Sequence, residues 1–85
     1  YVRDDCSPTV PFESVRALIG QCITSFPYTI ERNERNLGST RTFERLTMEA
    51  EGDYFAYCDQ DDVWEKTKIE NMTAILEKHP EMELL

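Results

Sequence analysis

Three aspartates fall within four positions in the stretch AYCDQDDVWEKTK, residues 56–68. Carboxylates this close together repel one another, so a cation or the start of a helix must make the arrangement favourable. Asp59 and Asp61 form an Asp-x-Asp pair directly after an apolar run, and hard oxygen ligands suit Mg²⁺ or Mn²⁺. We therefore expect Asp59 and Asp61 to hold a divalent cation, with Asp62 completing its shell or capping the helix that follows.

Two other interpretations of this acidic stretch match part of its pattern. Carboxylates also favour the positive end of a helix dipole, so a plain helix start remains open. A calcium-binding helix-loop-helix site would use Asp59, Asp61 and Glu70 as its first, third and twelfth residues. It is excluded, because Val63 and Trp64 occupy the fifth and sixth positions, which need an oxygen ligand and a glycine.

Strand-like and helix-like patterns alternate along the chain. Alternating or continuous apolar residues predict strands, and apolar residues spaced by three and four predict helices. Thr9 or Ser7 is expected to cap the first helix, and Ser39 or Thr40 the second. The expected strands are 1–3, 28–33, 53–58 and 81–85, and the expected helices are 11–26, 40–51 and 64–78. This order predicts an α/β fold of three layers, α/β/α, around a mostly parallel sheet.

The loops that follow three of these strands are polar: DDCSPT, ERNLGS and DQDDVW. In open parallel sheets, ligands bind beyond the carboxyl ends of the strands. We therefore expect the three loops to converge on one binding site at that edge of the sheet.

Composition restricts the partners and the location of the protein. The 85 residues carry a net charge of −8 with a pI near 4.5, which argues against nucleic acids or anionic membranes as charge-driven partners. Three widely spaced cysteines favour a reducing compartment, with the cytoplasm as the expected location. No apolar run in these residues approaches the roughly 20 needed for a membrane span, and no segment has the pattern of a signal peptide. Because the sequence starts without Met, we expect it to be a piece of a longer protein.

Three motifs together resemble a known family. VRDDCS, RNERNLGSTRTFERL and GDYFAYCDQDDVWEKTKIE are similar, in this order and spacing, to bacterial family 2 glycosyltransferases of the GT-A fold. The resemblance is greatest to rhamnosyltransferase-like enzymes that assemble surface polysaccharides, and it covers nearly the whole chain. It implies inverting transfer from a nucleoside-diphosphate sugar, a partial nucleotide-diphospho-sugar transferase (Rossmann-like) fold, and a divalent cation, Mn²⁺ or Mg²⁺.

The resemblance also implies roles for individual residues. Asp59 and Asp61, with Asp62 in support, would hold the cation against the donor diphosphate. The expected nucleotide-binding residues lie in the first two loops: Asp4, Asp5, Ser7, Asn36, Gly38 and Arg41. Asp5 is the first candidate to accept from the base, whereas plain turn roles for Ser7 and Gly38 and a solvated Arg41 remain open.

Family members carry a Pro-Thr-Tyr-Asn-like strand before this region and an acceptor-binding half with the carboxylate base after it. We therefore expect residues 1–85 to be a single partial domain that binds the donor, contains no catalytic residue and is inactive alone. A saccharide or lipid-linked acceptor is implied, which leaves the cytoplasmic face of the membrane open as the parent's location. Exposed sheet edges predict self-association, and a noncatalytic acidic interaction domain is the rival interpretation.

Overall fold

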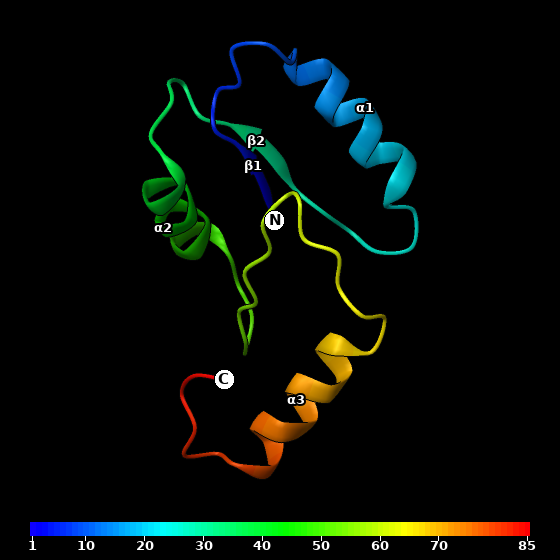
Figure 1. Ribbon diagram of the computed structural model, residues 1–85, viewed down its shortest axis with the longest axis vertical. Coiled ribbons are helices and arrows are strands. Elements are labelled where there is room, and N and C mark those ends of the chain that lie inside the picture. The colour runs from blue at the N-terminus through cyan, green and yellow to red at the C-terminus, as the bar shows by residue number, and fades with distance from the viewer. The chain divides into compact units, whose positions relative to one another are not determined.

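Two short parallel strands form the sheet of the computed structural model, which describes all 85 residues (Figure 1). Strand β1 (Val2–Asp4) pairs with β2 (Ile30–Arg32) in the register Val2 to Ile30 and Asp4 to Arg32. Parallel neighbours need a crossover connection, and helix α1 (Phe12–Cys22) provides it. The expected parallel α/β pairing is thus confirmed for the first two strands.

The strands belong to the first of two compact units, which spans Tyr1–Gly52. Helix α2 (Ser39–Glu49) follows β2 and contacts β1. Within this unit α1 and α2 lie on opposite sides of the two strands in Figure 1. The part of the fold prediction that is confirmed is an α/β arrangement with a parallel sheet of two strands.

Both helices of this unit begin without a side-chain cap. The cap position of α1 is Pro11, whose carbonyl accepts from the Ser14 N–H at 3.0 Å. The cap position of α2 is Gly38, and Ser39 is already the first helical residue. The predicted caps Thr9, Ser7, Ser39 and Thr40 are therefore wrong. For the second helix the reason is the positive φ of Gly38, which makes this glycine the cap position, so that the helix starts one residue earlier than predicted.

The most buried side chains of the structure are polar. Asn33 and Thr42 are 1% and 7% exposed, and no hydrophobic side chain reaches the same burial. Buried polar groups are favourable only when they are hydrogen-bonded. The centre of the first unit is accordingly a hydrogen-bond network that lies where the loops after β1 and β2 meet α2.

The second unit, Asp53–Leu85, contains helix α3 (Lys68–Lys78). This helix begins later than the predicted start at residue 64 or 65. The N–H of Lys68 donates to the Glu65 carbonyl at 3.0 Å, and the Lys68 ammonium lies 4.1 Å from the centre of the Trp64 ring. Residues 65–68 therefore form a turn, and the helix continues from its end.

The predicted strands 53–58 and 81–85 are wrong, since neither segment is a strand in this structure. Side chains that favour strands are not sufficient to form one, because a strand also needs a hydrogen-bonded neighbouring strand and a covered face. The sheet contains β1 and β2 alone, and Tyr54, Phe55 and Tyr57 are about half exposed. Each of the three helices has 11 residues, and none is long and apolar enough to span a membrane.

Candidate functional site

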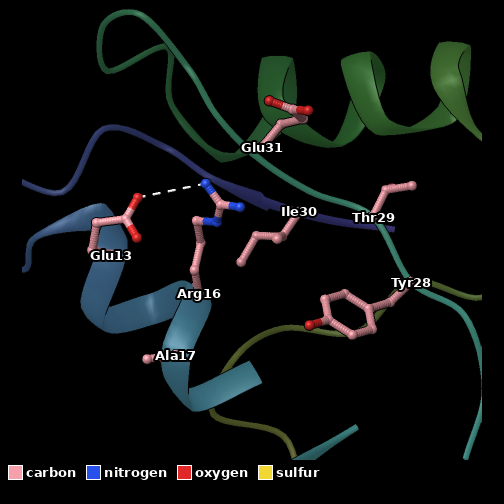
Figure 2. A pocket seen from close by; sticks show the side chains of 7 residues that line it. All are labelled: Glu13, Arg16, Ala17, Tyr28, Thr29, Ile30 and Glu31. Carbon is pink, nitrogen blue, oxygen red and sulfur yellow. Dashed lines mark hydrogen bonds and ion pairs between the residues drawn. The ribbon is translucent and has the colours of Figure 1, made fainter. Parts of the chain in front are cut away.

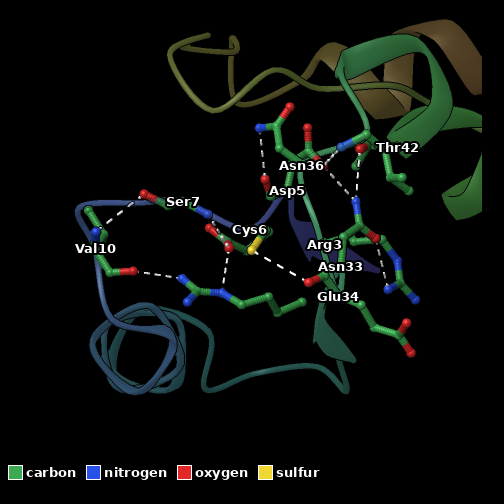
Figure 3. A network of polar contacts seen from close by, with 12 residues as sticks. Arg3, Asp5, Cys6, Ser7, Val10, Asn33, Glu34, Asn36 and Thr42 are labelled. Carbon is green, nitrogen blue, oxygen red and sulfur yellow. Dashed lines mark hydrogen bonds and ion pairs between the residues drawn. The ribbon is translucent and has the colours of Figure 1, made fainter.

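The carboxylate of Asp5 joins the loop after β1 to the loop after β2 (Figure 3). Its Oδ1 accepts the backbone N–H of Leu37 at 2.8 Å, and its Oδ2 accepts that of Gly38 at 2.9 Å. The side chain of Asn36 returns the contact by donating to the Asp5 carbonyl at 3.0 Å. Three residues expected to bind nucleotide, Asp5, Asn36 and Gly38, are thus brought together by hydrogen bonds between two loops.

These donors also fix the charge of Asp5. The Leu37 N–H, followed by the Asn33 amide, lowers the pKa of the Asp5 carboxyl below its ordinary value, because both donate to the ionised form. Asp5 is therefore an acceptor at neutral pH. Its lone pairs can meet a further N–H or O–H donor, which is the kind of group that a nucleobase or a ribose presents.

Behind Asp5 lies the buried amide of Asn33. Its Nδ2 donates to Asp5 Oδ1 at 2.9 Å and to the Thr42 hydroxyl at 3.0 Å, and its Oδ1 accepts from Arg3 Nη1 at 3.3 Å. Nη2 of the same Arg3 guanidinium forms an ion pair with Glu49. Sequence reasoning missed Arg3, Asn33 and Thr42. The available signal was a charged residue inside β1 and an amide directly after β2, both at polar positions of expected strands.

Asp4 is engaged in holding its own loop. Its Oδ2 lies 2.6 Å from Arg32 Nε and accepts the Ser7 N–H at 3.1 Å. The Ser7 hydroxyl in turn accepts the Val10 N–H at 3.3 Å. The contacts of Ser7 are thus those of a turn residue, and Asp4 supports the loop through Arg32.

Cys6 and Gly38 adopt the two positive φ angles of the chain. Cys6, at φ 55, turns the loop between Asp5 and Ser7. Gly38 has φ 86 and ψ 162, a region that side chains rarely tolerate. The structure therefore gives Gly38 a backbone role that no other residue type fills without strain. Arg41 lies in the first turn of α2 with its side chain exposed.

The acidic group of the second unit consists of Asp59, Asp61 and Asp62. One carboxylate oxygen from each lies within 4.8 Å of the others, and all three side chains are exposed. A turn brings them together, in which the Asp62 N–H donates to the Asp59 carbonyl at 3.1 Å. Three carboxylate oxygens so grouped fit the donor set of Mg²⁺ or Mn²⁺, whose remaining ligands are water and phosphate.

The helix-start interpretation of the same aspartates is not supported. The cap position of α3 is Thr67, and the acidic residue in its first turn is Glu70. Asp62 precedes the helix by six positions, so the prediction that it caps the helix is wrong. A role at the start of the helix therefore does not account for the grouping of these three carboxylates.

A separate open pocket lies between α1 and the approach to β2 (Figure 2). Its volume is about 600 Å³, and Arg16 on its wall forms an ion pair with Glu13 at 3.5 Å. The lining residues are Glu13, Arg16, Ala17, Tyr28, Thr29, Ile30 and Glu31. None of them was predicted to bind the nucleotide or a metal.

Comparison with known proteins places this chain in a family. The model of the family described as glycosyl transferase family 2 matches residues 1–82. The chain therefore belongs to glycosyl transferase family 2. Its parallel strand pair and three helices are consistent with a partial GT-A fold.

A curated protein with a similar sequence is also described as a glycosyltransferase. An uncharacterized glycosyltransferase of Haemophilus influenzae is 29% identical over 84 residues, which cover 99% of this chain and 26% of the relative. The chain thus spans about a quarter of the length of the relative that it matches. No solved structure matches the chain.

Proposed function

We propose that this chain is the donor-binding part of an inverting glycosyltransferase that uses a nucleoside-diphosphate sugar and a divalent cation. The observation that carries the proposal is the acidic group of Asp59, Asp61 and Asp62, whose oxygens gather within 4.8 Å in a chain of glycosyl transferase family 2. Such a group explains how a protein of charge −8 can bind an anionic donor.

Asp59 and Asp61 are the proposed cation ligands, with Asp62 as a third ligand or as a partner of a metal-bound water. When bound, the cation neutralises negative charge on the nucleoside diphosphate as it leaves the sugar. The aspartates themselves would bind the cation and orient it, because each offers an exposed carboxylate oxygen from a turn.

The nucleotide is the proposed ligand of the two loops in the first unit. Asp5 accepts from the base, and the backbone at Gly38 allows a close approach of the ribose, because no side chain shields it there. Asn36 fixes the second loop through the Asp5 carbonyl. Asp4 and Ser7 support the first loop, and Arg41 is the proposed contact to the sugar diphosphate because its exposed cation complements phosphate.

Transfer itself needs a base that these residues do not supply. General-base catalysis typically contributes ~10²–10⁴-fold, and we propose that the base and the saccharide or lipid-linked acceptor site belong to other parts of the parent enzyme. Polysaccharide synthesis, a cytoplasmic location or one at its membrane face, and self-association through sheet edges remain predictions.

Calorimetry tests the proposal. The protein is titrated with UDP, dTDP and GDP, each with Mn²⁺ and each with EDTA. We expect one of the three to bind in a Mn²⁺-dependent manner, and the double variant Asp59→Asn, Asp61→Asn to reduce its affinity to the EDTA level. Asp53→Asn is the matched control, because it removes one carboxylate of the same unit outside the acidic group. Equal affinity with and without Mn²⁺ would contradict the proposal, and absence of any binding would favour a noncatalytic interaction domain.

A further inference from the structure

Arg3 is a buried cation next to the proposed nucleotide loops. Its side chain is 5% exposed, and its Nε has no hydrogen-bond partner. A buried charge with an orphan donor is unfavourable for folding when compared with an apolar side chain of similar volume. Its two ends contact different groups: Asn33 on one side and Glu49 on the other.

The contact with Asn33 determines which way the buried amide points. A primary amide has an acceptor end and a donor end, whereas a guanidinium only donates. Arg3 therefore holds Oδ1 of Asn33 toward itself at 3.3 Å, and Nδ2 is left facing the Asp5 carboxylate at 2.9 Å. The reversed amide would place its oxygen against Asp5, and both groups would then be acceptors.

The Asp5 carboxylate in turn holds the second loop. It accepts the N–H groups of Leu37 and Gly38, at 2.8 Å and 2.9 Å. A chain of hydrogen bonds thus runs from Arg3 through Asn33 to Asp5 (Figure 3). It continues from Asp5 to the backbone of residues 37 and 38.

We propose that Arg3 is a positioning residue for the nucleotide-binding loops, acting through the Asn33 amide on the Asp5 carboxylate. The effect of Arg3 on nucleotide binding rests on the proposed function. Its effect on the loop rests on the hydrogen bonds alone. The competing explanation is that Arg3 only ties β1 to α2 through Glu49, whose side chain is 40% exposed.

Amide hydrogen exchange in the full-length protein without nucleotide separates the two explanations. Arg3→Met removes every donor and keeps an unbranched apolar side chain. We expect it to speed exchange at the Leu37 and Gly38 amides roughly tenfold, which corresponds to the loss of about one hydrogen bond. The matched control is Glu49→Gln, which removes the ion pair but not the contact with Asn33, and it should leave both amides unchanged.

Asn33→Ala provides a second test that keeps the pair between Arg3 and Glu49. It should produce the same exchange change as Arg3→Met, and the double variant should add nothing to either, since residues that act in one chain are not additive. If Arg3→Met does not fold, Arg3→Leu, which also removes every donor, takes its place in these comparisons. Additive effects, unchanged exchange in Arg3→Met or Asn33→Ala, or equal effects of Arg3→Met and Glu49→Gln would overturn the inference.

Nucleotide affinity is measured on the same variants with Mn²⁺ and UDP, dTDP or GDP. Arg3→Met should weaken the nucleotide that binds by roughly tenfold, and Glu49→Gln should not change it. If the unchanged protein binds none of the three, the proposed function fails, and the exchange result still decides the role of Arg3. Fast exchange without weaker binding in Arg3→Met would overturn its role in positioning the nucleotide.

Discussion

The Asp5 carboxylate accepts the backbone N–H of Gly38 at 2.9 Å, although the two residues lie 33 positions apart in the sequence. Gly38 reaches this partner with φ 86 and ψ 162, a combination found almost only in glycine. The loop before α2 therefore depends on two residues in different ways: a carboxylate that supplies the acceptor, and a glycine that lets the backbone present its N–H.

Gly38→Ala should destabilise the protein by about 1–3 kcal/mol, the usual strain of a side chain in this region of the backbone. The strain comes from the dihedral angles alone, because an added Cβ would have no atom within 4 Å. Urea unfolding followed by circular dichroism measures the change.

Gly20→Ala is the matched control for this prediction. Gly20 lies inside α1, where alanine is favoured over glycine by about 1 kcal/mol. Its new Cβ would lie 3.2 Å from the Tyr28 hydroxyl, which is the movable end of a side chain. We expect a small stabilisation, so the two glycine variants should change the free energy of unfolding in opposite directions. Two changes of the same sign and size would contradict this account.

Local patterns in the sequence predicted the first unit well, apart from the caps and ends of its helices. The spacing of Val15 and Ile19 predicted α1, and the alternation around Ile30 predicted β2. These patterns succeed because each element finds its partner within the unit. The aromatic segment 53–58 has the same kind of pattern, but its strand prediction failed because strand formation depends on a hydrogen-bonded neighbour as well as on propensity.

The candidate site was predictable where one short motif carries it. The spacing of Asp59, Asp61 and Asp62 predicted a group of oxygens, and the structure brings those oxygens together. The partnership of Arg3 with Asn33 spans 30 positions. It arises only when β1 and β2 align side by side, so no local pattern could have indicated it.

Acid should release the loop that Asp5 holds. The hydrogen bond from the Leu37 N–H, with that from Asn33, lowers the pKa of Asp5 in the folded protein. A lowered carboxyl pKa stabilises the fold above the unfolded pKa, which for aspartate is about 4, and this contribution is lost as the pH falls through the lower folded pKa. Glu49 behaves in the same direction, because Arg3 lowers its pKa.

Urea unfolding at several pH values checks this prediction with the variant Asp5→Asn. Above about pH 4 the variant should be less stable than the unchanged protein, and the difference should shrink as the pH falls further. Glu49→Gln serves as a comparison, because it removes the second lowered carboxyl and leaves the contacts of Asp5 in place. A stability difference for Asp5→Asn that is independent of pH would show that its ionised form does not hold the loop.

Asp62 contributes to the acidic group in two separable ways. Its backbone N–H closes the turn onto the Asp59 carbonyl at 3.1 Å, and its carboxylate is the third oxygen of the group. Asp62→Asn keeps the N–H and removes only the charge. We expect it to weaken Mn²⁺ binding by roughly ten- to a hundredfold, the range typical of a ligand-supporting carboxylate.

The electron paramagnetic resonance signal of free Mn²⁺ measures this affinity, with Asp53→Asn as the control for loss of one charge from the same unit. If both variants bind Mn²⁺ as the unchanged protein does, Asp62 serves the turn alone, and the cation site is reduced to Asp59 and Asp61.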